Sequence, residues 1–577
     1  MTASRHQEDL AAAFDEMADL LAIEGDNPFR VRAYRRAAQV VRGQPDDLFA
    51  RIEAGFDPDE LPGIGPDLAE KIRRFVATGR LPQLEAQRRK VPAGLRELLR
   101  IPGLGPKRVQ ALHAALQVRN LQDLRAAIDR GALRGVPGFG TKLQAQLRRH
   151  LATTADTERR TLRATAEGAA EALRAYLAAQ AGVTRVEIAG SYRRGRETVG
   201  DLDVIVCGSP RLQMASLLSG YDDIVKVTSQ GMTRASFVLR SGLAVDLRLV
   251  PPESAGAALQ YFTGSKAHNL RLRRRAQQRG CKLNEYGLFR GARRIAGATE
   301  ESIYAALGLP WIPPELREDR GEFEAAAAGR LPRLVTIADL RGDLHVHTAA
   351  SDGTATLEQM AAAARERGLQ YIAIADHARY LGIVRGLDAN ALARQIDAID
   401  RFNSTSKDIV VLKSAEVDIL PDGTLALPDA ILSRLDLVVI AVHSAFTLPL
   451  RKQTDRLLRA LDQRYVSILA HPSARLIGER AALAVEWSSV LARAKARPCY
   501  LEINAQPMRL DCDEQLARAA ADAGVLLCIS SDTHAPRDFD LLRHGVTQAR
   551  RAWVTREHLL NTLPLAALRQ RLAATMR

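Results

Sequence analysis

The aspartates at positions 201 and 203 stand in a setting that indicates phosphoryl-transfer chemistry. They follow a Gly-Ser turn and two arginines in the stretch GSYRRGRETVGDLDVIV, residues 190–206. In a strand, side chains two residues apart point to the same face, so Asp201 and Asp203 place their carboxylates side by side. Two carboxylates that close resist ionising together unless a cation lies between them.

A third acid extends this pattern. Asp246 lies inside AVDLRLV, an apolar run at 244–250 that follows another predicted strand at 236–240. Three acids, a turn that offers backbone N–H groups, and Arg193 and Arg194 together predict a two-metal site for phosphoryl transfer. A lone Asp-x-Asp pair is often two solvated aspartates beside a turn, but the complete set disfavours that interpretation.

A second set of candidate residues lies in the C-terminal part, where six of the twelve histidines fall between positions 343 and 534. Each stands where a short apolar run ends, and three acids share this placement. Imidazole and carboxylate without thiolate suit Mn²⁺, Zn²⁺ or Fe²⁺, and the sequence does not choose among them. The predicted ligands are His345, His347, Asp352, His377, Glu416, His443, His471, Asp532 and His534.

The elements that must position this second set are short apolar strands alternating with helices from residue 343 onward. About seven such strand–helix units predict a barrel of parallel strands. Active sites of such barrels lie at the C-terminal ends of the strands, where these histidines and acids fall.

The N-terminal part contains an internal repeat of the form apolar-Pro-Gly-apolar-Gly followed by a helix, at 61–72, 101–112 and 136–147. Two helices are predicted before it, within 7–42. A Gly-x-Gly turn bares backbone N–H groups at a helix N-terminus, which suits DNA phosphates without reading bases. The residues expected to bind DNA in this way are Gly63, Gly65, Gly103, Gly105, Lys107, Gly138, Gly140 and Lys142.

The net charge of +15 supports a polyanionic partner because it is unevenly distributed. Residues 1–300 contain 48 Lys and Arg against 33 Asp and Glu, whereas residues 301–577 contain 34 of each. No apolar run approaches the ~18 residues of a membrane span, and the polar start is not a signal peptide. The five cysteines show no pairing pattern. We therefore expect a cytoplasmic protein.

The stretch 190–206 and the segment YFTGSKAHNLRLRRRAQQRGCKLNEYGLFR at 261–290 resemble the palm and thumb of family X DNA polymerases. The resemblance implies that Asp201 and Asp203 bind two Mg²⁺ or Mn²⁺ ions, and that Asp246 binds the catalytic ion and activates the primer 3′-hydroxyl. It also implies a set of residues that contact the incoming dNTP or the template. These are Gly190, Ser191, Arg194, Gly200, Tyr261, Phe262, Gly264, Asn269 and Arg273.

The first repeat resembles the small amino-terminal domain of this family, which in some members removes a 5′-deoxyribose phosphate through a Schiff base. Lys71 falls at the position of the nucleophile, and Tyr34 falls on a matching tyrosine. Asp67 lies one helical turn before Lys71, and a nearby acid keeps an amine protonated and poorly nucleophilic. Lys71 is therefore either a lyase nucleophile or a plain phosphate contact.

The motifs DLHVHTAASDG, ADH, AEV, VHS, AHP and SDTH resemble those of the PHP (polymerase and histidinol phosphatase) domain, with all nine ligand positions filled. The resemblance implies a Mn²⁺ or Zn²⁺ cluster and a 3′→5′ exonuclease, with an abasic-site endonuclease as a further role. A family X polymerase joined to a PHP domain is the bacterial and archaeal form, so the resemblance implies a bacterial, nucleoid-associated protein, which we expect to be a monomer. We expect a repair polymerase that fills short gaps, acting on gapped or nicked DNA with dNTPs.

The resulting prediction is a multidomain chain in which each domain has its own fold. It comprises helix-hairpin-helix domains at 1–90 and 91–153, an α+β palm at 154–250 led by a helix at 156–180, a thumb at 251–317, a linker at 318–337 and a distorted α/β (β/α)7 barrel at 338–577.

Three other functions agree less well with the sequence. A repair nuclease or abasic-site endonuclease whose polymerase half mainly positions DNA is disfavoured by the intact acid triad. A non-enzymatic scaffold for DNA ends would not need two complete metal sites. A small-molecule phosphatase would leave the basic N-terminal half without a purpose.

Overall fold

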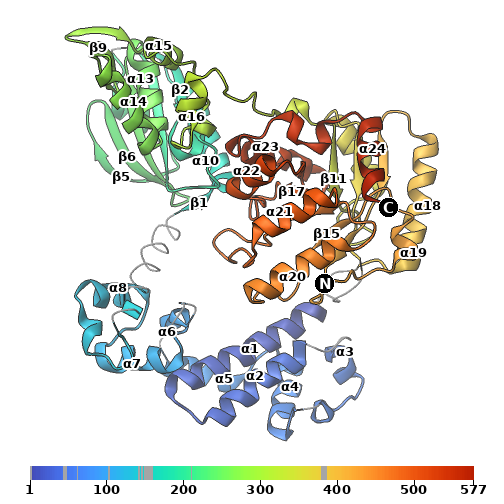
Figure 1. The fold of residues 1–577 in the computed structure, drawn as a ribbon. Helices are drawn as coiled ribbons and strands as arrows, with labels where there is room; N and C mark the ends of the chain where they lie inside the picture. The colour runs from blue at the N-terminus through green and yellow to red at the C-terminus, as the bar shows by residue number, and fades with distance from the viewer. Residues whose placement is uncertain are drawn as a thin grey trace. The chain divides into compact units, whose positions relative to one another are not determined.

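The computed structural model describes residues 3–42, 48–61, 63–91, 93–99, 101, 104–140, 143–144, 147, 160–209, 211–378 and 386–576. The chain forms two compact units, Met1–Glu158 and Arg159–Arg577, each drawn as a ribbon in Figure 1. Within the described ranges, every helix is either too short or too polar to span a lipid bilayer.

The first unit is helical, as the sequence predicts. Its first helix ends just before Asn27 and its second begins just after it. The Asn27 side chain accepts a hydrogen bond from the N–H of Phe29 at 2.9 Å. Their apolar faces join one core that includes Leu10, Phe14 and Ile72. The helices are α1 (Ala3–Glu24), α2 (Pro28–Arg42), α3 (Leu48–Glu53), α4 (Pro66–Thr78), α5 (Pro82–Lys90), α6 (Ala93–Leu98), α7 (Pro106–Leu116) and α8 (Leu121–Asp129), with short 3₁₀ turns at Pro58–Glu60 and Ala132–Gly135.

The second unit begins with a five-stranded mixed sheet in the order β2–β4–β7–β6–β5. Alternation along β4 sends Leu202, Val204 and Val206 to one face, where they pack with α10 and α12. Ile205 and Cys207 face the other side and pack with α13. The elements are α10 (Arg163–Ala178), β2 (Val183–Ile188), α11 (Gly190–Arg193), β4 (Asp201–Gly208), α12 (Met214–Leu218), β5 (Ile224–Gln230), β6 (Arg234–Leu239) and β7 (Ala244–Val250).

The helix predicted at 156–180 begins later, at Arg163. Residues 156–159 lie outside the described part of the chain. Thr161 and Leu162 are extended because they form strand β1 (Thr161–Leu162), which pairs antiparallel with β3 (Thr198–Val199). The polar, helix-compatible composition before Arg163 gives no sign of this long-range pairing.

The thumb has a small core of its own around Leu272, Leu288 and Tyr304. Its elements are α13 (Ala255–Thr263), α14 (Lys266–Gln278), β8 (Lys282–Asn284), β9 (Gly287–Arg290), β10 (Arg293–Ala296) and α15 (Glu300–Ala306).

The segment predicted as an interdomain linker is folded over much of its length. It contains α16 (Glu322–Ala327), and a 3₁₀ turn at Pro314–Leu316 lies just before it. Arg317 and Glu322 are fully buried. Arg317 donates to Glu300, and Glu322 lies 2.7 Å from His268 Nδ1. These charged residues therefore have buried partners and are not part of a solvent-exposed linker.

The rest of the second unit is a barrel of parallel strands, which confirms the predicted fold (Figure 1). Two sheets, β11–β12–β13 and β14–β15–β16–β17–β18, are joined by parallel bridges from His377 to Glu416 and from Val346 to Thr533. One predicted strand is divided into two short strands, β13 and β14. These two count as one of the seven strand–helix units that close the barrel. The strands are β11 (Gly342–Val346), β12 (Tyr371–Ile374), β13 (Val410–Lys413), β14 (Glu416–Asp418), β15 (Val439–Ala441), β16 (Ile468–Leu469), β17 (Tyr500–Asn504) and β18 (Leu527–Ser530).

Helices surround these strands in the order of the chain. They are α17 (Leu357–Glu366), α18 (Ala389–Thr405), α19 (Asp429–Leu432), α20 (Leu450–Asp462), α21 (Trp487–Ala496), α22 (Glu514–Ala523), α23 (Leu542–Arg551) and α24 (Leu565–Thr575).

Candidate active sites

The three palm acids lie on two neighbouring strands, as the sequence predicts. Strands β4 and β7 run parallel, and Asp203 is the register partner of Asp246. Alternation places Asp201 and Asp203 on the face of β4 that packs against α13. Burial raises the pKa of Asp203 to about 7, and the charges of Asp201 and Asp246 add to this increase. Such a group of carboxylates is stabilised when cations bind between them.

The Gly-Ser turn lies directly against these acids. Gly190 has a φ of +60°, and a Cβ atom there would lie only 2.2 Å from Asp203 Oδ2, so only glycine fits. Ser191 follows it in the short helix α11, and Gly200 directly precedes β4. Asp246 is held from the other side, where Ser236 Oγ donates to Oδ1 and Arg234 donates to Oδ2 at 3.2 Å.

The two adjacent arginines of the turn have different surroundings. Arg194 Nη1 donates to the carbonyl oxygen of Thr263 at 2.6 Å, and Nε donates to Glu318 at 3.1 Å. Arg193 instead forms a two-pronged pair with the buried Glu300, at 2.9 and 2.8 Å. The prediction that both arginines serve the acid site is therefore wrong for Arg193, because its guanidinium is taken up in an ion pair between palm and thumb.

The residues predicted to contact the nucleotide and template gather at the end of α13 and the start of α14. The guanidinium of Arg273 lies 4.8 Å from the ring centre of Tyr261. Asn269 Nδ2 donates to the carbonyl oxygen of Tyr261 at 2.6 Å. The ring of Phe262 packs edge-on against that of Tyr261, with 5.0 Å between ring centres. Gly264 ends α13 beside Arg194, since a Cβ atom there would lie 3.1 Å from Arg194 Nη1.

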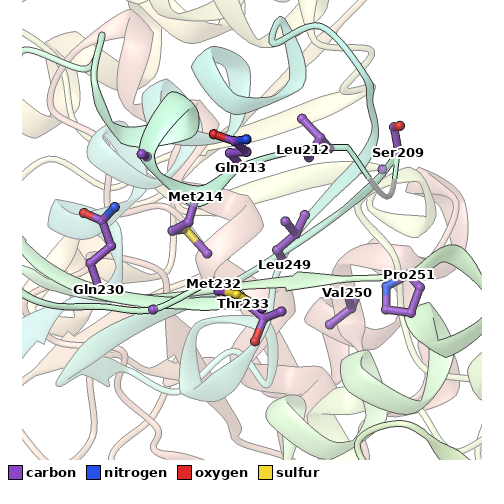
Figure 2. Close-up of a pocket in the computed structure, with 13 residues that line it drawn as sticks. Ser209, Leu212, Gln213, Met214, Gln230, Met232, Thr233, Leu249, Val250 and Pro251 are labelled. Atoms are coloured by element: carbon purple, nitrogen blue, oxygen red, sulfur yellow. The ribbon is translucent and has the colours of Figure 1, made fainter.

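A cavity of about 680 Å³ lies at the opposite end of the same strands from the acids (Figure 2). It is bounded by Met214, Met232, Leu249 and Pro251, and none of its described lining residues is an acid or a base. The cavity therefore lacks groups for the chemistry of the acid site.

The nine predicted metal ligands of the barrel converge around Glu416. Its carboxylate oxygens lie 2.9 Å from His377 Nδ1, 2.9 Å from His471 Nε2, 3.2 Å from His443 Nε2 and 3.4 Å from His345 Nε2. The remaining members connect to this group through further close contacts between imidazole and carboxylate. They are His347, Asp352, Asp532 and His534.

The donor atoms in this cluster fit metal ions. Three subsets have ligand atoms within 4.8 Å of one another, namely His347–Asp352–His377–His534, His345–His347–Asp532 and His377–Glu416–His443. Buried ring nitrogens of His345, His347 and His471 have no hydrogen-bond partner among the described residues. A buried polar atom without a partner is costly, and imidazole nitrogen is a common ligand of Mn²⁺, Zn²⁺ and Fe²⁺.

Opposite charges balance one another in the cluster. Burial alone would lower the pKa of His377, but Glu416 and Asp352 raise it to about 11. Burial alone would raise the pKa of Glu416, but His377, His443 and His345 hold it well below its usual range. Metal ions compete with protons for the same atoms, so metal loading of this site depends on pH.

Sequence reasoning missed five buried residues that hold the ligands in place. Glu502 Oε1 lies 2.8 Å from His345 Nδ1, and Glu502 Oε2 accepts a hydrogen bond from the N–H of His471. The sequence pattern that could have identified them is a polar residue inside or just after an apolar strand, because a buried polar group without a partner is costly. Asp343, Asp418, Glu502 and Asn504 contact ligands directly, and Asp376 accepts hydrogen bonds from Thr348 and Ser351 beside them.

The three N-terminal repeats share one local structure. The residue between the two glycines donates its N–H to the first apolar residue, from Ile64 to Leu61 at 3.0 Å, Leu104 to Ile101 at 2.9 Å and Phe139 to Val136 at 3.2 Å. The second glycine caps the following helix, as Gly65 does for α4 and Gly105 for α7.

The other residues predicted to bind DNA there fall into three pairs. Gly63 and Gly138 have positive φ angles of +91° and +87°. Lys107 and Gly140 are exposed to solvent. Gly103 and Lys142 lie outside the described residues.

Lys71 is buried in α4. Its Nζ forms an ion pair with Asp67 and lies 5.7 Å from the ring centre of Tyr34. Only 7% of Lys71 and 2% of Tyr34 is exposed. The structure thus brings the two predicted lyase residues together, with the amine tied to a carboxylate.

Family models match most of the chain. They are a helix-hairpin-helix domain at residues 5–81, a SAM-like helix-hairpin-helix tandem at 95–153, a DNA polymerase beta palm at 160–249, a DNA polymerase beta thumb at 258–318 and a PHP domain at 343–505.

Curated proteins with similar sequences match either the whole chain or one half. The DNA polymerase/3′-5′ exonuclease PolX of Bacillus subtilis (strain 168) is 34% identical, over 97% of this chain and 98% of its own length. A probable phosphatase of Thermoanaerobacter sp. (strain X514) is 26% identical over 38% of the chain and 89% of its own length. DNA polymerase lambda of Arabidopsis thaliana is 26% identical over 49% of the chain and 57% of its own length. The chain therefore belongs to the bacterial-type family X DNA polymerases, in which a polymerase beta-like core is joined to a PHP domain.

Proposed function

We propose that this chain fills short gaps in DNA during repair, adding nucleotides in the palm and removing them from 3′ ends in the barrel. The observation that carries the proposal is the register of β4 and β7, which sets Asp203 opposite Asp246 beside Asp201. The whole-length similarity to a DNA polymerase/3′-5′ exonuclease supports it. The DNA substrate we propose is gapped or nicked, with dNTPs as the second substrate.

In the palm, Asp201, Asp203 and Asp246 would hold the two metal ions. Bound Mg²⁺ or Mn²⁺ supplies charge neutralisation and activation of the primer 3′-hydroxyl. Gly190 lets the turn lie against Asp203, and Arg194 presents its guanidinium to the β- and γ-phosphates of the dNTP.

Tyr261, Phe262 and Gly264 would line the sugar of the dNTP. Asn269, which donates to the carbonyl oxygen of Tyr261 and accepts from Gln260 at 2.7 Å, would contact the base edge. The stacked Arg273 would contact the template. Ser191 and Gly200 would complete the turn around the phosphates.

In the barrel, the nine clustered residues would hold Mn²⁺ or Zn²⁺. Bound ions of this kind supply a hydroxide near neutral pH and clamp a phosphodiester. Glu416 joins the parts of the cluster, since its two oxygens face different histidines. Glu502 and Asp418 fix the orientation of His345 and His443 through their Nδ1 atoms, at 2.8 Å in both cases.

The test uses the purified full-length protein on one-nucleotide-gapped DNA with Mg²⁺ or Mn²⁺, with and without dNTPs. Extension is expected with dNTPs and shortening of the 3′ end without them. Asp203→Asn should abolish extension and spare shortening, and His347→Asn should do the reverse. Asp222→Asn, at an exposed palm position, is the matched control. Loss of both activities in either folded variant would contradict the assignment of two separate sites.

A further inference from the structure

The turn that carries Arg194 is held from behind by the barrel within the second compact unit. Glu197 pairs with Arg475 and accepts a hydrogen bond from Gln548 at 2.8 Å. At Gly195, a Cβ atom would lie 2.3 Å from Thr547 Cγ2, so α23 packs directly on the backbone of the turn. The backbone position of Arg194 is therefore set in part by the PHP domain.

Arg551, the last residue of α23, contacts Arg194 most directly. Its side chain is 1% exposed, and its three nitrogens have three different acceptors. Nη1 donates to the carbonyl oxygen of Arg194 at 2.6 Å, Nη2 donates to Glu318 at 3.0 Å, and Nε donates to Glu514. A buried arginine whose three nitrogens all donate hydrogen bonds is held rigidly, because its planar guanidinium fixes the directions of all three bonds.

Glu318 connects the two arginines. The same oxygen, Oε1, accepts from Arg194 Nε at 3.1 Å and from Arg551 Nη2 at 3.0 Å. Arg194 and Glu318 are each 14% exposed, so this link lies largely out of water. Without the carboxylate, two buried guanidinium groups would face each other, and the Arg194 side chain would lose one of the two contacts that orient it.

We propose that Glu318 and Arg551 are positioning residues for the nucleoside triphosphate, and that α23 of the PHP domain is thereby a structural part of the polymerase site. The inference rests on the proposed function, in which Arg194 binds the phosphates. Arg551 acts on the backbone of Arg194, and Glu318 acts on its guanidinium. The Arg194 guanidinium then points its remaining N–H groups toward the triphosphate.

The experiment measures single-nucleotide addition by the full-length protein over a range of dNTP concentrations. Glu318→Ala and Arg551→Met should each raise KM for dNTP at least about fivefold while kcat falls less than about twofold. Such a split marks lost ground-state binding. Glu318→Gln should stay within about twofold of wild type, because its amide oxygen can still accept from both arginines. Shortening of 3′ ends by the barrel should stay unchanged in all three variants, which shows that they are folded.

Arg194→Ala separates failure of the inference from failure of the proposed function. If Arg194→Ala raises KM but Glu318→Ala and Arg551→Met do not, the positioning role is wrong and the proposed function stands. If Glu318→Ala lowers KM, the carboxylate competes with the triphosphate for Arg194, which overturns positioning. If Arg194→Ala changes neither KM nor kcat, both the phosphate role of Arg194 and the inference built on it fail.

Discussion

Glu416 shows at the level of one residue how the barrel site is built. Its carboxylate is 1% exposed and lies within 3.7 Å of five imidazole rings. An isolated buried charge of this kind would be very costly, so the site stays folded only with protons or metal ions on the surrounding rings. Residues that fix those rings should therefore control metal affinity.

Glu502 provides the test of that expectation. It is fully buried, orients His345, and accepts hydrogen bonds from the N–H of His471 and from Asn504. Glu502→Gln should weaken metal binding by about 10- to 100-fold, the usual effect of losing a hydrogen-bond partner behind a ligand.

The measurement is the Mn²⁺ or Zn²⁺ content of the protein after dialysis against graded free metal. Glu366→Gln, at an exposed position of α17, is the matched control. Equal metal affinity in the two variants would show that Glu502 does not support the site.

Lys71 allows a second prediction at this scale. The ion pair with Asp67 occupies its amine, so borohydride should trap only a small fraction of the enzyme on 5′-deoxyribose-phosphate DNA. Asp67→Ala should increase the trapped fraction by freeing the amine, and Lys71→Ala should abolish trapping in either background. Strong trapping by the unmodified protein would instead make Lys71 a working nucleophile.

The sequence predicted residues that end apolar runs far better than residues inside them. The nine barrel ligands stand at strand ends, where parallel strands bring them to one rim, and they could be selected by position alone. Glu502 lies inside β17, where its apolar neighbours indicate a buried strand but do not show which ligands it holds. Arg193 was misassigned for a related reason, since its partner Glu300 is more than a hundred residues away in sequence.

At the scale of elements, most of the correct predictions came from the alternation of side chains between the two faces of a strand. The run at 201–208 became β4 with its acids on one face, and the run at 244–250 became β7 with the predicted bounds. The errors occurred where a distant partner overrides local preference. Thr161 and Leu162 form β1 instead of the predicted helix because they pair with β3, and Glu322 in the predicted linker at 318–337 is buried beside His268.

The packing of α10 against α23 provides a prediction about pH. His544 on α23 is 4% exposed, and burial together with Arg543 lowers its pKa from 6.5 to about 4, while Glu167 on α10 opposes the shift. Between these values the unfolded chain binds more protons than the folded chain, so stability is lost as pH falls from 6.5 toward 4. The loss attributable to this residue is on the order of 2 to 3 kcal/mol.

Thermal melting at pH 7.5 and at pH 5 should show this loss. His544→Gln should reduce the fall in Tm on acidification relative to wild type, because glutamine does not titrate. An equal fall in both proteins would assign the acid sensitivity to other groups.

At the scale of the whole molecule, the palm, thumb and barrel form one unit, although they were predicted as separate domains. Long-range ion pairs join them, such as Arg475 with Glu197 and Arg550 with Glu315. A fragment ending at 317 would leave these charged groups without partners. The division that the packing supports lies after residue 158, since Met1–Glu158 and Arg159–Arg577 are the two compact units.

That division leads to a prediction about DNA binding. Residues 1–158 contain 25 Lys and Arg against 21 Asp and Glu, whereas residues 159–577 contain 57 against 46, so most of the excess positive charge lies in the second unit. Each phosphate neutralised by a cation adds about 0.9 to the slope of log affinity against log salt. Hairpin contacts made through backbone N–H groups add affinity with little effect on that slope.

Fragment 159–577 should therefore bind gapped DNA more weakly than the full chain at every salt concentration, yet keep more than half of its salt slope. As a matched test, replacing the exposed thumb residues Arg274 and Arg293 with alanine in the full chain should reduce the slope by up to about 2. Fluorescence anisotropy of labelled gapped DNA across a salt series measures both quantities. If fragment 159–577 loses most of the slope, the first unit supplies the main cationic contacts, and the role assigned to the thumb arginines is wrong.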